Sequence, residues 1–411
     1  MSDQSLGANL KAARKMRGLS VNQLAELVSV SPSYVKKIES GSRRSNSRLS
    51  LAFARALMVG EEVLTGQPYY GDPEAEDRVH AIVPDLRRLL LTYDSPEELV
   101  VSPRALIVLG SEVDQIAALR RDAKYAPMGP LIPPVITELT HLALDARSEQ
   151  ETRRAYWHLA RAYRAVNSLA HKLGHHDLSN TALERVRWAA DRSGDPLMQV
   201  TAGYLIAGAL IRTGAFPAAR RMLEGLRSEL ERQMPEHSYT ADGLAVDGAL
   251  VLKLAVVESR CNNQARVRDY LEEAKRIAHV AGGVDSLAYE MSFGPTNIKI
   301  HEVHALIEAC DTEQALARLD EWGSDSGPWV PPQSTVGERF THHLIDTAHA
   351  RLVEGDARAA FGDLKAARQI AANHVRFHPQ ARGTTTALLR NSRFPSEELT
   401  QYAAWQGVTT H

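Results

Sequence analysis

The 411-residue sequence predicts an all-α fold, with a small five-helix domain at residues 1–66, a linker at 67–78 and a long helical array at 79–411. Two observations predict it. Apolar residues recur at helical spacing in almost every segment beyond the linker, where alternating strand patterns are scarce. In addition, a pattern of small residues and leucines repeats in the second half of the chain, which is typical of stacked helical hairpins.

The first two helices are predicted from their start and stop signals. Ser5 is suited to cap the first, which Gly18 stops. The second follows Ser20, whose hydroxyl is suited to cap it, and runs through Val28. A tight connection to the next helix follows.

A third helix is predicted to begin after Ser31, with Pro32 in its first turn, because proline lacks an N–H that a helix start leaves unpaired. It ends near Gly41, since glycine readily adopts the left-handed conformation of a helix end. A fourth apolar stripe comprises Leu49, Ala52, Phe53, Ala56 and Leu57. A short element at 61–64 closes the domain.

The net charge of −2 hides an asymmetry between the two ends of the chain. Residues 1–66 carry ten basic and five acidic side chains, and the remainder carries 38 basic and 45 acidic ones. A basic segment on an acidic body favours polyanion binding at the N-terminal end, because neutralised phosphates release counterions.

Taken together, residues 5–66 resemble the phage-repressor (XRE, Cro/repressor) helix-turn-helix family. The resemblance rests on the segment GLSVNQLAELVSVSPSYVKKIESGSRR and on LSLAFARALMVGEEVLTG, in which spacing, capping and apolar pattern agree. It implies a five-helix, lambda-repressor-like domain that binds double-stranded DNA. It also implies a homodimer, because one recognition helix reads few base pairs and two-fold symmetry multiplies specificity.

The resemblance places the DNA-reading face on the third helix. Its exposed positions are Pro32, Ser33, Lys36 and Lys37. Either lysine is suited to donate to guanine O6 and N7, and the alternative is that both merely solvate an exposed face. Arg43 and Arg44, just beyond the helix, are expected to contact phosphates.

One position departs from the family. The family commonly has a glutamine that opens the second helix and contacts the DNA backbone, whereas this sequence has Val21. Valine has no side-chain donor. We therefore expect Asn22 or Gln23 to make the backbone contact instead.

The segment after residue 66 is rich in helix breakers and acidic residues, so it reads as a linker. Beyond it, the short apolar stretch 105–110 resembles a strand. Its position between Pro103 and a helical pattern at 112–124 favours a helix start.

The helical array contains repeats. The turn residues align at Gly214, Asn262, Cys310 and Gly355, with an earlier turn near Gly174. Five residues later stand Ala219, Val267, Ala315 and Ala360. Four further on stand Leu223, Leu271, Leu319 and Leu364. This pattern is typical of a tetratricopeptide-like α-solenoid with long repeats, and an irregular bundle is the alternative.

The whole chain thus resembles bacterial regulators that join a helix-turn-helix domain to tetratricopeptide repeats, some of which respond to short signalling peptides. The resemblance implies that a peptide or protein ligand enters the solenoid groove. Asn297 is the first candidate for binding it, because the 293–295 break interrupts the repeats there. Tyr204, His301 and Arg339 follow, and ordinary packing between helices is the alternative for each.

Catalysis is not expected. His175 and His176 fall at a hairpin turn, where solvated histidines are common, and His301 with His304 lacks a third ligand and the H-E-x-x-H spacing. Phosphate-loop and nucleophile-elbow motifs are missing from the sequence. We therefore expect no enzyme, no catalytic residues, no metal and no cofactor.

The composition, with 44% hydrophobic and 24% charged residues, is that of a globular protein. Neither a signal peptide nor an apolar run of roughly 18 residues is found, so we expect a cytoplasmic protein with no membrane partner. Cys261 and Cys310 lie far apart, and we expect two buried reduced thiols.

Two functions fit these observations. The first is a sequence-specific DNA-binding transcriptional regulator whose helical body senses a ligand. The second is a protein-interaction scaffold or antitoxin-like module in which DNA binding is secondary. A preferred operator with a steep salt dependence favours the first, and weak binding to all duplexes favours the second.

Overall fold

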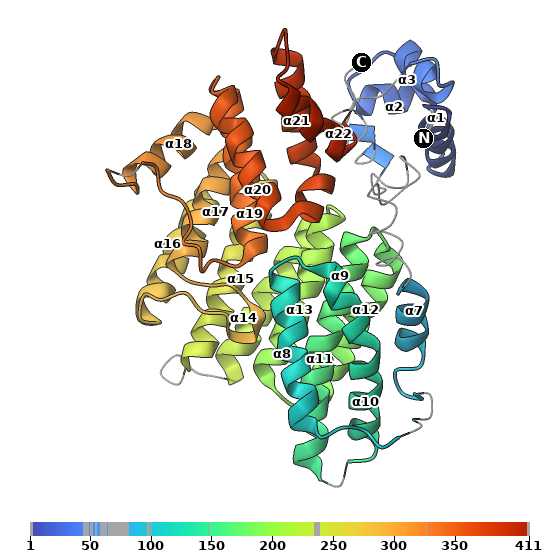
Figure 1. Ribbon diagram of the computed structural model, residues 1–411, viewed down its shortest axis with the longest axis vertical. Helices are drawn as coiled ribbons and strands as arrows, with labels where there is room; N and C mark the ends of the chain where they lie inside the picture. Colours follow the sequence, from blue (N-terminus) through green and yellow to red (C-terminus); the bar gives the residue numbers. More distant parts are fainter. Residues whose placement is uncertain are drawn as a thin grey trace. The chain divides into compact units, whose positions relative to one another are not determined.

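The computed structural model describes residues 3–43, 82–96, 99, 101–146, 148–233, 239–325 and 327–408, together with positions 49, 52, 53, 56, 57 and 64. These residues form helices and contain no β-strand, which confirms the all-α class (Figure 1). The chain divides into two compact units. The first comprises Met1–Tyr70 with Arg212–Ala215, and the second comprises Gly71–Ile211 with Phe216–His411.

The first unit begins with α1 (Asp3–Met16), α2 (Val21–Leu27) and α3 (Pro32–Glu39). The start expected at Ser5 is wrong, because α1 begins two residues earlier and Ser5 lies within its first turn. Among the residues described in this unit, nine buried apolar side chains form a core: Leu10, Ala13, Leu24, Ala25, Val35, Ile38, Phe53, Leu57 and Leu64. The bounds of the predicted fourth and fifth helices, like the predicted linker, lie outside the described residues.

The second unit opens with α7 (Val83–Leu91), α8 (Leu106–Arg121), α9 (Tyr125–Met128), the 3-10 turn η1 (Gly129–Leu131) and α10 (Ile132–Leu144). The helix start predicted at residues 105–110 is confirmed, because Ala105 is the N-cap of α8. Among the helices that the structure describes, none is both long and apolar enough to cross a bilayer.

In the described part of the chain, five pairs of helices follow. They are α11 (Glu149–Lys172) with α12 (His176–Ser193), α13 (Pro196–Arg212) with α14 (Phe216–Gln233), α15 (Ala241–Arg260) with α16 (Gln264–Val280), α17 (Pro295–Glu308) with α18 (Thr312–Glu321), and α19 (Gly337–Val353) with α20 (Ala357–Phe377). The 3-10 turn η3 (Ala288–Glu290) precedes α17, and α21 (Pro379–Asn391) and α22 (Glu397–Gln406) end the described chain. Figure 1 shows these helices in sequence colours.

The residues aligned as turns all adopt the left-handed conformation between paired helices, with φ of 77° at Gly174, 78° at Gly214, 58° at Asn262, 62° at Cys310 and 90° at Gly355. The aligned small residues and leucines of α14, α16, α18 and α20 are all buried. The repeated pattern therefore marks where the two helices of each pair pack together. The pairs also pack on one another, since α15 contacts α17 and α17 contacts α19.

The expected burial of the thiols is wrong, because both cysteines are free and exposed. Cys261 caps the C-terminus of α15, and Cys310 occupies the left-handed position after α17. Helix-ending turns lie at the surface of a stack of helices. Each cysteine is therefore exposed because it lies at the turn that ends a helix, although its side chain is apolar.

A buried ion cluster fastens the turn at η3 to the helices that precede it. Glu290 is 8% exposed and accepts hydrogen bonds from Arg120 at 3.0 Å and from Arg161 at 2.7 Å. Arg164 donates to the main-chain oxygens of Tyr289 and Glu290. Burial raises the pKa of Glu290, but the three arginines outweigh it and lower that pKa to about 2. The turn is thus held by charges from α8 and α11.

Candidate nucleic-acid interface

Two short helices, α2 and α3, and the four residues 28–31 that join them form the centre of the first unit. Ser20 caps α2: its Oγ accepts from the Gln23 N–H at 3.2 Å, while Gln23 Oε1 accepts from the Ser20 N–H at 2.8 Å. Ser31 caps α3 in the same way by accepting from the Tyr34 N–H. Such caps each stabilise a helix by about 1 kcal/mol. Both predicted helix starts are confirmed.

The orientation of α3 is fixed by α1. Arg14, only 8% exposed, donates two hydrogen bonds to the Glu39 carboxylate, at 2.6 and 2.9 Å, and a third to the Leu19 carbonyl. The hydrogen bond to Glu39 raises the pKa of Arg14. Gly7 lets the two helices approach, since a Cβ there would lie 2.3 Å from the Ile38 carbonyl oxygen. A bidentate pair and a close backbone contact thus hold α3 rigidly.

The predicted reading face of α3 is solvent-exposed. Val35 and Ile38 point into the core and are at most 1% exposed. The side chains on the opposite side are all exposed: Pro32, Ser33, Lys36 and Lys37. They stand at relative positions 1, 2, 5 and 6 of an eight-residue helix, so they form one continuous polar and basic face.

The end of α3 is a compact, basic turn. The Lys37 carbonyl accepts hydrogen bonds from the Arg43 N–H and from the hydroxyls of Ser40 and Ser42. The Arg43 guanidinium lies 4.3 Å from the centre of the Tyr34 ring, which holds its plane beside α3. Arg43 is exposed, as a phosphate contact requires. Arg44 lies outside the described residues.

The start of α2 offers two exposed amide side chains, at Asn22 and Gln23. Gln23 uses its carbonyl oxygen in the cap of Ser20. The NH₂ group of Gln23 takes no part in this cap. Val21 is half-buried against the core, so its apolar side chain serves packing.

A buried-core helix pair joined by a tight turn, with a basic exposed second helix, defines the class of DNA-binding helix-turn-helix proteins. The comparison with known families agrees: residues 5–65 match a family model described as a helix-turn-helix domain. No curated protein matches the chain. Residues 5–65 therefore form a helix-turn-helix domain, which supports a role for the protein as a DNA-binding regulator.

The ligand candidates of the second unit come from three helices: Tyr204 on α13, Asn297 and His301 on α17, and Arg339 on α19. Burial raises the pKa of Tyr204, but Lys253 and Arg339 outweigh it and lower that pKa to about 8. Burial and the charge of Arg339 lower the pKa of His301 to about 3. The same cations act on both side chains, so these residues lie near one another.

Lys253 on α15 joins this group, and the sequence analysis missed it. Its Nζ lies 3.3 Å from the centre of the Tyr204 ring and donates to the Tyr204 carbonyl. A lone lysine in an apolar helix gives no sequence signal of its partner. Asn297 donates to the Ser292 carbonyl at 2.6 Å, and its buried Oδ1 has no hydrogen-bond partner in the described part of the chain.

The histidines weighed for metal binding have other contacts. His304 Nδ1 lies 2.9 Å from Asp346 Oδ2, and although burial lowers its pKa, Asp346 raises it above the usual range. His175 and His176 are half-buried rather than solvated, and His176 contacts His171 at 3.3 Å. The expectation of solvated histidines at this turn is therefore wrong, because His176 begins α12 and packs against α11.

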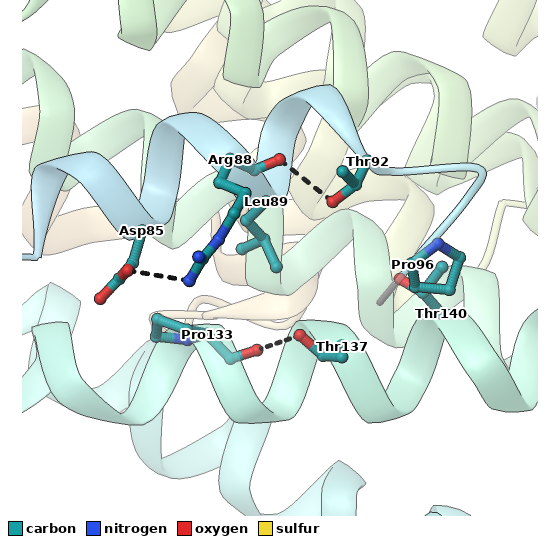
Figure 2. Close-up of a pocket in the computed structure, with 8 residues that line it drawn as sticks. All are labelled: Asp85, Arg88, Leu89, Thr92, Pro96, Pro133, Thr137 and Thr140. Carbon is teal, nitrogen blue, oxygen red and sulfur yellow. Dashed lines mark hydrogen bonds and ion pairs between the residues drawn. The ribbon is translucent and has the colours of Figure 1, made fainter. Parts of the chain in front are cut away.

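Figure 2 shows a pocket of about 180 Å³ between α7 and α10. Its threonines donate to main-chain carbonyls of their own helices: Thr92 to Arg88 and Thr137 to Pro133. Arg88 pairs with Asp85. Ligand sites are usually larger, at about 300 Å³ or more, and present converging polar groups. None of the predicted ligand residues lines this pocket.

Proposed function

We propose that the protein is a sequence-specific transcriptional regulator of the XRE type, which places α3 in the major groove of its operator. The observation that carries this proposal is the exposed face of Pro32, Ser33, Lys36 and Lys37 on a helix whose opposite side is buried. The ion pair of Arg14 with Glu39 fixes α3 against α1. A helix in a fixed orientation brings its lysines to defined base edges, which favours discrimination between bases.

Selection of bound sequences from random duplexes by the full-length protein tests this proposal. We expect enrichment of one inverted repeat, because a dimer carries two reading helices related by two-fold symmetry. Failure to enrich any sequence, with weak binding to every duplex, would favour the scaffold or antitoxin-like module.

We further propose that the helix pairs of the second unit form a tetratricopeptide-like solenoid that binds a short peptide or a partner segment. The left-handed turns, the buried small residues and the contacts between successive pairs support this architecture. Arg339 and Lys253 supply positive charge, and Asn297 Oδ1 is an acceptor in need of a donor. A peptide with a free carboxylate and main-chain N–H groups matches both.

A degenerate pool of short peptides, added to the full-length protein on its selected duplex, tests the sensing role. We expect the pool to change operator affinity for the wild type and to leave Asn297→Ala unaffected, with DNA binding of the free variant intact. Asn180→Ala, an exposed asparagine on α12, is the matched control. An equal response of wild type and Asn297→Ala would remove Asn297 from the site, and loss of folding would make it structural. The proposed function is not enzymatic.

A further inference from the structure

Three histidines from two packed helices and the turn after them meet in the second unit. His342 lies on α19, His374 lies near the end of α20, and His378 is both the C-cap of α20 and the N-cap of α21. The ring centres are 4.5 Å apart for His342 and His374, 5.1 Å for His342 and His378, and 5.3 Å for His374 and His378. One ring nitrogen of each lies within 4.8 Å of the others.

Local geometry explains the meeting. His374 and His378 are four residues apart, the spacing that puts two imidazoles on one side of a helical turn. Pro379 opens α21 and directs the preceding residue into an extended conformation, with φ −68° and ψ 121° at His378. α19 packs along α20 and brings His342 to the same place.

The cluster contains buried nitrogens in need of a partner. His374 Nε2 and His378 Nδ1 are buried and have no hydrogen-bond partner among the described residues. A buried polar atom without a partner destabilises the fold, because it has lost its hydrogen bonds to water. A metal ion bound at this place would satisfy both nitrogens, because a neutral imidazole nitrogen is a common metal ligand.

We propose that His342, His374 and His378 bind one divalent transition metal ion, with Zn²⁺ as the expected occupant. Imidazole nitrogens suit Zn²⁺ better than Mg²⁺ or Ca²⁺, which take oxygen ligands. A tetrahedral site with bonds of about 2.1 Å needs nitrogens about 3.4 Å apart, which small ring rotations supply. Three protein ligands leave the fourth position for water.

Nearby charges affect the affinity of this cluster for a metal ion. Asp346 lies one turn beyond His342 on α19, and its Oδ2 lies 2.9 Å from His304 Nδ1. A carboxylate at this place favours a bound cation. Lys172 disfavours a bound cation, because its positive Nζ lies 2.9 Å from His374 Nδ1 and 3.1 Å from Glu338 Oε1. When Nε2 of His374 binds the metal, Nδ1 carries the proton and can no longer accept a hydrogen bond from Lys172. Lys172 then keeps its ion pair with Glu338 alone.

Zinc titration of the full-length protein, purified without a histidine tag and stripped with a chelator, tests this inference. We expect one equivalent of Zn²⁺ to bind with a Kd on the order of micromolar or tighter. His374→Gln should weaken binding by roughly 100-fold or more, whereas His279→Gln, an exposed histidine on α16, should bind as the wild type does. Lys172→Met should bind more tightly, because it removes the like charge.

Co²⁺ absorption and zinc-edge X-ray absorption of the wild type need no variant and so guard against misfolding. We expect the visible bands of tetrahedral Co²⁺ and a first shell with three imidazoles. A wild type that does not bind Zn²⁺ in this titration overturns the inference. So does a His374→Gln protein that keeps wild-type affinity, or a zinc shell without imidazoles. The inference does not rest on the proposed function, since DNA binding can fail while zinc binding holds.

Discussion

At the residue scale, we expect the basic side chains of the first unit to make different kinds of contact with DNA. Lys36 and Lys37 are exposed on α3, whereas Arg43 stacks on Tyr34 beyond its end. A donor on the helix face reaches base edges, and a donor at the turn reaches phosphates. Specificity and general affinity should therefore separate by mutation.

We expect the double variant Lys36→Ala and Lys37→Ala to bind operator and unrelated duplex with nearly equal affinity, because the base contacts are lost. Arg43→Ala should weaken binding to every duplex and reduce the salt slope by about one. Fluorescence anisotropy over a salt series measures both effects. A lysine variant that keeps its operator preference would place the reading face elsewhere.

Glu290 offers a second test at this scale. Its pKa of about 2 lies below the value of 4.5 for an ordinary glutamate, so its charge stabilises the fold above pH 4.5, and that contribution is lost as pH falls towards 2. The shift corresponds to about 3 kcal/mol. We expect Glu290→Gln to lower the free energy of unfolding of the second unit at pH 7 by about 3–5 kcal/mol, because the arginines lose their counter-charge.

Denaturant titrations at several pH values measure this effect. The difference in the free energy of unfolding between Glu290→Gln and the wild type should decrease as the pH falls from 4.5 to 2. Glu149→Gln is the control, because that carboxylate is exposed and pairs with Arg153 on the same helix. Its effect should stay below about 1 kcal/mol. Equal stability of Glu290→Gln and the wild type at pH 7 would show that the cluster does not hold the turn.

At the scale of elements, one glycine substitution separates close packing from helix propensity. Gly7→Ala places a Cβ 2.3 Å from the Ile38 carbonyl oxygen, so α1 and α3 must move apart. We expect a loss of about 1–3 kcal/mol in the first unit and weaker operator binding. Gly225→Ala in α14 meets no atom within 4 Å and should gain up to about 1 kcal/mol. Thermal unfolding measures the stability of both variants, and fluorescence anisotropy measures their operator binding. A Gly7→Ala protein with wild-type stability and affinity would refute the close contact.

Local signals predicted much of the helical structure. The caps at Ser20 and Ser31 and the left-handed turns of the repeat follow from short-range chemistry, and the structure has them in place. The start predicted at Ser5 is wrong because serine is common both at an N-cap and inside a first turn, so the residue type alone does not separate the two positions. The pairing of Arg14 with Glu39 and the gathering of three arginines on Glu290 were missed, since each joins residues distant in sequence.

The same limit applies to the sites. The exposed face of α3 could be predicted because helical spacing alone assigns its sides. The neighbours of Tyr204 could not, because Lys253 comes from another helix. The histidine cluster carried one signal, the four-residue spacing of His374 and His378, but His342 joins it only through the packing of α19 on α20.

At the scale of the whole molecule, the proposed regulator requires two copies on one operator. We expect half-sites about 10 base pairs apart, so that both reading helices enter the major groove on one face of the duplex. Footprinting of the selected operator, with light scattering of the complex, measures spacing and stoichiometry. A single protected half-site bound by one protein molecule would contradict dimeric recognition.

The central claim is that the exposed face of α3 binds duplex DNA. Its most direct test is titration of the full-length protein with the selected duplex across a salt series. We expect tight binding in dilute buffer and a linear fall of log K with log salt, with a slope of about −0.9 for each neutralised phosphate. No association with any duplex in dilute buffer would contradict it.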